Sequence, residues 1–303
     1  MRILILLVII ILPLELLSQQ VVDTTYNPVI LNPVYKEGKG PVIFIDEGHF
    51  NLNTRNGRYK PFAKLLEKDG YKVMGYKSEF KKADLLKGKI LVISNALNEQ
   101  AENWVIPNPS AFTKSEIEEI RQWVIEGGNL FLIADHMPMG DASKDLALVF
   151  GFEFSNGFVF ESQQAKGPII FKQKEKTLVE SIITKGRDSK ENVEIIASFT
   201  GQAFKIPNDA TSILTFSKNY INYLPDTAWI FNDKTPKFNV EGWSQGAFKK
   251  YGKGKIIVFG EAAMFSAQLS GPYLYKAGMN SELAPNNYQL LLNIIHWLDG
   301  KLE

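Results

Sequence analysis

The stretch GGNLFLIADHMP, from Gly127 to Pro138, decides the predicted fold. A glycine pair precedes the apolar run Leu130 to Ala134, and Asp135 and His136 come directly after that run. A short apolar run behind a helix and a glycine turn is typical of a buried parallel strand, and open α/β sheets bind ligands just past the carboxyl ends of such strands. The position of His136 therefore predicts a functional site.

A second histidine stands in the same relation to another predicted strand. The segment PVIFIDEGH, Pro41 to His49, is an apolar run that ends in Asp46, Glu47 and His49. The chain has three histidines, so two of the three follow predicted strands. His296 lies in the last turn of a predicted helix, where an imidazole can satisfy terminal carbonyl groups, and we interpret it as structural.

The segments around these strands alternate between strand and helix patterns. A capping box, Thr113-Lys-Ser-Glu116, begins a helix with an apolar stripe that ends at the glycine pair. Alternation of this kind predicts parallel strands joined by right-handed crossovers. The other predicted strands are 42–45, 71–76, 90–93 and 254–259, and the other predicted helices are 61–68, 82–87, 143–150 and 286–298.

Two regions depart from this alternation. Residues 94–112 form a long loop with Trp104, which we expect to be one wall of the site because long loops tend to be functional. From about residue 151 to 251, strand-like runs such as 152–160, 193–199, 212–216 and 227–231 are separated by Gly, Pro and Asn. We interpret the second region as a β-rich insertion or an antiparallel extension of the sheet. A separate domain is the alternative, but no Ser- or Pro-rich linker brackets the region.

The N-terminus predicts export. Arg2 precedes an apolar run from Ile3 to Leu14, and Ser18 lies near a plausible cleavage point, which is typical of a secretory signal peptide at residues 1–20. A membrane anchor is the alternative, but the uninterrupted run is short for a span. We expect no stable anchor after cleavage, a periplasmic or secreted protein, and an irregular lead-in at residues 21–40.

Composition excludes several classes of function. The 303 residues are 45% hydrophobic and 22% charged, which is ordinary for a globular protein, and the net charge of +1 indicates no nucleic-acid partner. The chain has no cysteine, so it has no disulfide, no lipid-modified cysteine and no thiolate nucleophile.

Four stretches together resemble the class I glutamine amidotransferase-like superfamily, in particular its members without glutaminase activity, the ThuA-like and GIFT-domain-like bacterial proteins of unknown function. They are 41–51, FTKSEIEEIRQWVIEGGNLFLIADH at 112–136, GKIIVFGEAAMF at 254–265, and the last helix with NIIHWL. The resemblance implies a flavodoxin-like fold with a pocket. True amidotransferases carry a cysteine where this chain has Asp135-His136, so the protein is not a cysteine-dependent glutaminase.

The strand ends suggest a metal site. His49, His136 and Glu261 each follow a predicted parallel strand, and two imidazoles with a carboxylate could hold a catalytic zinc or another divalent metal. Asp135 and Glu47 could supply a further ligand, a base or support for a ligand.

Two alternatives use the same residues without a metal. His136 or His49 could act as a general base, oriented by Glu47, Asp135 or Glu261, or these side chains could only brace loops. Substrate contacts are predicted from Trp104, Gln268 and the polar loop 46–59; in that loop, Asn51, Asn53, Arg55 and Arg58 could hold a carboxylate or sugar hydroxyls.

The sequence therefore predicts an α/β protein, a flavodoxin-like three-layer sandwich with a mostly parallel sheet, in which a single domain at 41–303 carries the β-rich insertion. The predicted function is that of a hydrolase, metal-assisted or metal-free, acting on a small polar or carbohydrate-derived substrate. The alternative is a non-catalytic module that binds a small-molecule or glycan ligand or serves in assembly.

Overall fold

The computed structural model describes residues 20–100, 103–162 and 167–302. The predicted signal peptide lies outside the described residues, except for Gln20. Within the described ranges, no helix is both long and apolar enough to cross a membrane.

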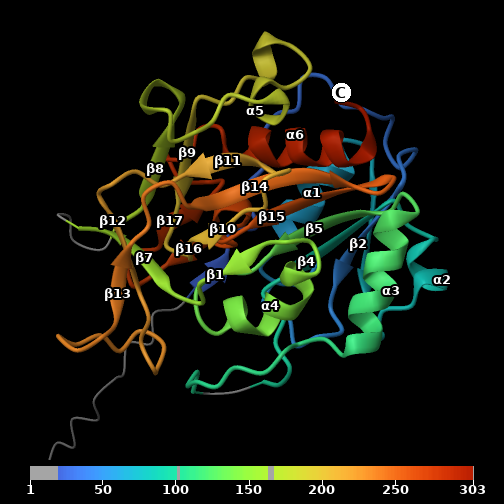
Figure 1. The fold of residues 1–303 in the computed structure, drawn as a ribbon. Helices are drawn as coiled ribbons and strands as arrows, with labels where there is room; N and C mark the ends of the chain where they lie inside the picture. Colours follow the sequence, from blue (N-terminus) through green and yellow to red (C-terminus); the bar gives the residue numbers. More distant parts are fainter. Residues whose placement is uncertain (1–19, 101–102, 163–166, 303) are drawn as a thin grey trace, which may run out of the picture.

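One large sheet forms the centre of the molecule (Figure 1). Its strand order is β3-β2-β4-β5-β15-β14-β10-β6, and β11 also pairs with β14. The strands are β2 (Val42–Asp46), β3 (Lys72–Tyr76), β4 (Ile90–Ser94), β5 (Asn129–Ile133), β6 (Glu153–Phe154), β10 (Phe204–Lys205), β11 (Thr211–Thr215), β14 (Ser244–Tyr251) and β15 (Gly254–Phe259).

Only part of this sheet is parallel. The pairs that join β3, β2, β4, β5 and β15 are parallel, whereas every pair made by β14 and β10 is antiparallel. The reason lies in the connection between β14 and β15, a turn of Gly252 and Lys253 in which Gly252 has a φ of +58°. Two residues can join only antiparallel neighbours. The large sheet is therefore mixed, and the prediction of a mostly parallel sheet is not met.

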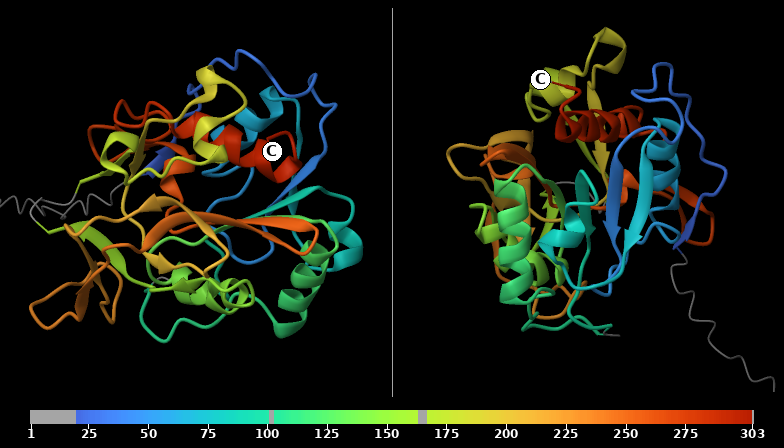
Figure 2. Two further views of the ribbon diagram at one scale, coloured as in Figure 1. Left: turned by 45° about the horizontal axis from the view of Figure 1, so that its top comes forward. Right: turned by 90° about the vertical axis from the view of Figure 1, so that its right-hand side faces the viewer.

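Helices pack on both faces of the large sheet. In Figures 1 and 2, α6 and α3 lie on opposite sides of the strands, with α1 near α6 and α4 on the side of α3. The helices are α1 (Lys60–Lys68), α2 (Lys82–Leu85), α3 (Lys114–Ile125), α4 (Met139–Leu148), α5 (Ile182–Lys185) and α6 (Asn287–Asp299), with short 3-10 turns at η1 (Gln173–Glu175), η2 (Ser189–Glu191) and η3 (Ala263–Phe265).

The parallel strands are apolar throughout because both of their faces are covered. In β5, Phe131 and Ile133 belong to the core beneath α1 and α6, while Leu130 and Leu132 belong to the core beneath α3 and α4. All four side chains are fully buried. The alternation explains why the opening stretch reads as a continuous apolar run.

Three smaller sheets accompany the large one. They are β1 (Gln20–Val22) with β16 (Ala267–Ser270) and β17 (Tyr275–Gly278); β7 (Phe158–Glu161) with β12 (Tyr220–Tyr223) and β13 (Lys237–Asn239); and β8 (Ile169–Lys172) with β9 (Ile195–Ser198). Strands between residues 151 and 251 thus extend the large sheet and also form two of the small ones.

The structure corrects three local predictions. Helix α4 begins at Met139, four residues before its predicted start, immediately after the turn that carries His136. Residues 227–231 are a loop and not a strand, with a single bridge from Thr227 to Val105. The lead-in is not entirely irregular, because β1 pairs antiparallel with β16.

The capping box and His296 both have structural roles. The Thr113 hydroxyl accepts from the Glu116 amide, and the Glu116 carboxylate accepts from the Thr113 amide, as the sequence predicts. His296 is fully buried, and its Nε2 lies 2.6 Å from Oδ2 of Asp69. This histidine therefore links α6 to the residue that ends α1.

Candidate active site

A pocket of about 710 Å³ opens past the carboxyl ends of the central strands. Asn95 follows β4, Asp135 and His136 follow β5, and Glu261 follows β15, and all four line it. This is where ligands bind in open α/β sheets. Trp104 and Gln268 also line the pocket, as the sequence predicts.

His136 is held by its neighbours in one orientation. Its Nδ1 lies 2.8 Å from the Met137 carbonyl oxygen, and its ring stacks on Phe158 with centroids 4.3 Å apart. The Trp229 ring meets it edge-on at 4.7 Å. A carbonyl oxygen can only accept, so Nδ1 carries the proton and Nε2 is the basic nitrogen of the neutral ring. That Nε2 lies 3.9 Å from Oδ1 of Asp135.

Asp135 is fixed by contacts on three sides. Its backbone amide donates to the Asn95 side chain at 3.0 Å, and its Oδ1 accepts from the His136 amide at 2.8 Å. The Gln202 amide nitrogen donates to the backbone carbonyls of Ala134 and Asp135, both at 2.9 Å. These contacts hold the end of β5 in place. The side chains of Asp135 and His136 are consecutive, and both line the pocket.

Glu261 is a buried carboxyl group close to Asp135. Burial and the nearby Asp135 carboxylate raise the pKa of Glu261 well above its ordinary range, and backbone hydrogen bonds from Met264 and Ala263 only partly oppose this shift. The two amide-to-carboxyl distances are 2.8 Å each. Burial and the neighbouring carboxylate therefore both favour the protonated form of Glu261.

A chain of buried hydroxyl groups supports the pocket from behind. The Asn53 side chain donates to the Ser94 hydroxyl, Ser94 donates to the Tyr59 hydroxyl, and Tyr59 donates to the Ala262 carbonyl, each at 3.0 Å. Ser94 is therefore occupied in a structural network, and its hydroxyl is directed to Tyr59.

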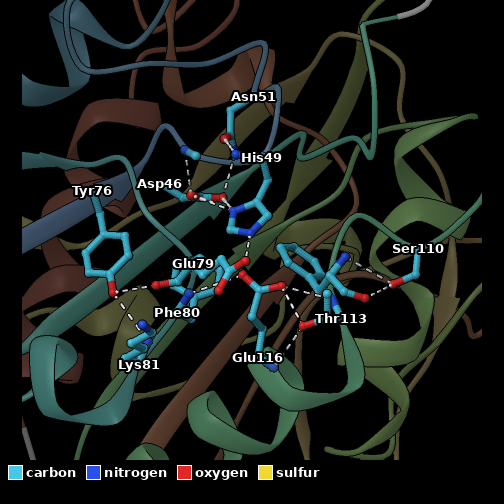
Figure 3. A network of polar contacts seen from close by, with 12 residues as sticks. Asp46, His49, Asn51, Tyr76, Glu79, Phe80, Lys81, Ser110, Thr113 and Glu116 are labelled. Carbon is cyan, nitrogen blue, oxygen red and sulfur yellow. Dashed lines mark hydrogen bonds and ion pairs between the residues drawn. The ribbon is translucent and has the colours of Figure 1, made fainter.

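His49 does not join the pocket, which corrects the predicted three-residue centre. Its Nδ1 lies 2.9 Å from Asp46, and its Nε2 lies 2.8 Å from Glu116 (Figure 3). The ring stacks on Phe80 with centroids 4.6 Å apart. Both ring nitrogens are engaged because the loop after β2 turns His49 toward the start of α3, and His49 does not line the pocket that holds His136 and Glu261.

Three more predicted site residues serve the same loop. The Asn51 side chain donates to Asp46 at 2.9 Å, and Glu47 accepts from the Arg55 amide at 2.8 Å. The Arg55 guanidinium donates to the Val73 carbonyl at 2.9 Å and to Glu67 at 2.6 Å. Glu47, Asn51 and Arg55 do not line the pocket.

A metal site made of the predicted ligands does not fit this geometry. Within the part of the chain that the structure describes, no group of three or more His, Asp or Glu side chains could hold a metal ion. With both nitrogens of His49 engaged elsewhere, the proposed ligand set loses one imidazole.

Several residues that line the pocket were not predicted, among them Asn95 and Trp229. Asn95 follows β4 directly, and the rule that selected Asp135 would have found it. Trp229 lines the pocket with a φ of +67° and remains 46% exposed. Its segment has the apolar pattern of a strand, so nothing in the sequence marks it as a pocket loop.

Comparison with known proteins shows a similar fold. No family model matches the chain, and no curated protein matches it. The mmIFT52 N-terminal domain has a TM-score of 0.59 at 16% identity, covering 85% of this chain and 96% of that domain. The likeness shows a shared fold and nothing about activity.

Two further structures have lower scores. One is described as a ThuA-like protein from Bacteroides uniformis ATCC 8492, with a TM-score of 0.47 at 12% identity, covering 89% of this chain and 96% of that one. The other is described as a GMP synthase protein from Thermoplasma acidophilum, with a TM-score of 0.42 at 11% identity, covering 86% and 94%.

Proposed function

We propose that this protein is a hydrolase that acts on a small polar or carbohydrate-derived substrate, with His136 as its general base. The observation that carries the proposal is the fixed tautomer of His136, whose basic Nε2 lies 3.9 Å from Asp135 in the pocket. A neutral imidazole next to a carboxylate can take a proton from water, and the carboxylate then stabilises the imidazolium.

Glu261 completes the proposed chemistry. His136 removes a proton from water, the resulting hydroxide attacks the substrate, and the leaving group takes a proton from an acid. A carboxyl group with a raised pKa is suited to that role because it keeps its proton to a higher pH than an ordinary glutamate does. No step requires a metal.

The aromatic and amide side chains suit a polar substrate. Trp104 and Trp229 offer ring surfaces, and Asn53, Asn95 and Gln268 offer amide groups. Aromatic surfaces next to hydrogen-bonding groups accommodate sugars and other hydroxylated molecules, which have apolar faces and polar edges.

The experiment is a turnover assay with 4-nitrophenyl esters and 4-nitrophenyl glycosides, including uronides. His136→Gln should lower kcat/KM on the order of 100- to 10,000-fold, and Asp135→Asn should also lower it. Arg55→Gln is the control, because Arg55 lies outside the pocket. A variant at His136 that keeps the wild-type rate, or no turnover across the panel, contradicts the proposal.

One observation favours a non-catalytic binding module as the second candidate. Both oxygens of Glu261 accept backbone amides of the turn that follows β15, as a purely structural carboxylate would. If this candidate is right, the His136→Gln protein binds its glycan or small-molecule ligand as well as the wild type, which a glycan array with both proteins measures.

A further inference from the structure

Arg58 brings a cationic side chain to the pocket without a partner of its own. It lies in the loop between β2 and α1, one residue before Tyr59, and lines the pocket together with Asp135. Among the described residues its side chain has no hydrogen bond and no ion pair. Burial lowers the pKa of Arg58, and the Asp135 carboxylate acts in the opposite direction.

Arg55, in the same loop, shows what a structural arginine looks like here. Its guanidinium donates to the Val73 carbonyl, the Asn56 side chain and Glu67. The two arginines are three residues apart, yet they differ. The donors of Arg55 are bonded within the loop, whereas Arg58 lines the pocket and its donors have no bond among the described residues. A partly buried guanidinium that keeps its donors unpaired is costly, and a bound anion would relieve that cost.

The charges around Arg58 limit the anion that fits. Lys276 is exposed and also lines the pocket, so the described residues of the lining carry two cationic groups and the two carboxyl groups of Asp135 and Glu261. With Glu261 protonated, the lining has a net charge of about +1. A monoanion complements this net charge, whereas a dianionic phosphate carries one negative charge more than the lining balances.

We propose that Arg58 binds the carboxylate of a hydroxylated monoanion, a uronic acid or a similar sugar acid, so that the substrate is an acidic carbohydrate derivative. The planar fork of a guanidinium matches the two oxygens of a carboxylate, and the amide side chains of Asn53 and Asn95 lie on the same pocket lining for hydroxyl groups. The substrate class rests on the proposed hydrolase function, but the binding site itself does not depend on turnover.

Calorimetric titration of the purified protein with matched acid and neutral sugars tests this inference. The probes are glucuronate with glucose and galacturonate with galactose, and inorganic phosphate serves as the competing anion. The wild type should bind a uronate roughly tenfold or more tightly than the matched neutral sugar. Arg58→Gln should remove that preference, and Arg58→Lys should keep only part of it because lysine lacks the fork.

Arg55→Gln is the matched control and should keep the uronate preference, because its donors serve the loop and not the pocket. The inference is overturned if no uronate binds at millimolar concentration, if phosphate binds more tightly than either uronate, or if Arg58→Gln keeps the preference. Uronate binding that requires Arg58, without turnover of any ester or glycoside, would support the site and reject the hydrolase. Turnover of acidic substrates that is insensitive to Arg58→Gln would support the hydrolase and reject the site.

Discussion

His49 and His136 look equivalent in the sequence, and their surroundings make them different. His136 keeps a basic nitrogen in the pocket, whereas His49 is enclosed by Asp46 and Glu116. Burial lowers the pKa of His49, but hydrogen bonds and charge from Asp46, and then from Glu116, outweigh burial and raise it above the ordinary 6.5. For Glu116, burial raises the pKa, but hydrogen bonds from Thr113 and His49 outweigh burial and lower the pKa overall.

These shifts predict how stability depends on pH. A raised histidine pKa means that protonated His49 stabilises the folded state fully below about pH 6.5 and that this contribution is lost as the pH rises through the folded-state pKa. A lowered Glu116 pKa gives a contribution that is present above about pH 4.5 and lost as the pH falls through its folded-state pKa. The network is therefore strongest at mildly acidic pH.

His49→Gln should lower the free energy of unfolding by about 3 kcal/mol at mildly acidic pH, because it leaves two buried carboxylates without their shared cation. The difference from wild type should shrink at alkaline pH. Urea unfolding across this range measures both. Phe80→Leu is the control, since it removes the stacked ring and keeps the polar contacts, and its effect should not vary with pH. Equal pH slopes for His49→Gln and wild type would contradict the assignment.

At the scale of elements, the glycine pair fixes how α3 meets β5. Gly127 has a φ of +118°, a conformation that disfavours any other residue, and a Cβ on Gly128 would lie 2.2 Å from the indole ring of Trp123. The Trp123 side chain is 1% exposed, so it has no room to move. The helix and strand can pack this closely only because position 128 has no side chain.

Gly128→Ala should therefore destabilise the protein by about 1–3 kcal/mol or more, the usual cost of overpacking a core. Trp123→Phe leaves a void of its own, but the smaller ring gives the new methyl group space. The double variant should thus lose less stability than the sum of the single variants, and a double-mutant cycle in urea measures this difference. Strict additivity would show that the Trp123 contact is not the cause.

At the scale of the whole molecule, segments from both ends of the chain complete the pocket. Gln20 and Gln268, on the paired strands β1 and β16, both line it. The Asn280 side chain donates to Asp23 at 3.0 Å, immediately after β1. The predicted cleavage lies near Ser18 to Gln20, and cleavage before Gln20 would leave β1 complete at the start of the mature protein.

Removal of β1 should therefore weaken the fold. A chain of residues 26–303 should have a free energy of unfolding about 2 kcal/mol lower than one of residues 20–303, because it loses the pairing with β16 and the Asp23 contact. Urea unfolding compares the two. Expression of the full chain in a bacterium, followed by N-terminal sequencing of the periplasmic product, tests the cleavage: an uncleaved product would contradict the predicted export.

The sequence by itself determined the parallel half of the sheet and the start of α3. A strand that is buried on both faces requires a continuous apolar run, and a capping box acts within four residues. Each feature is therefore specified by residues that are close together in the sequence. The same local logic placed Asp135, His136 and Glu261 at strand ends that line one pocket.

Only the tertiary structure decided which strand-end side chains meet there. His49 turns to Glu116, 67 residues away, and Trp229 reaches His136 from a loop whose sequence resembles a strand. The direction of a side chain beyond the end of a strand depends on the loop backbone and on partners distant in sequence, whereas periodicity records only burial along the strand. For the same reason the strand order and register in the antiparallel half of the sheet, and the difference between Arg55 and Arg58, could not be predicted from residue order alone.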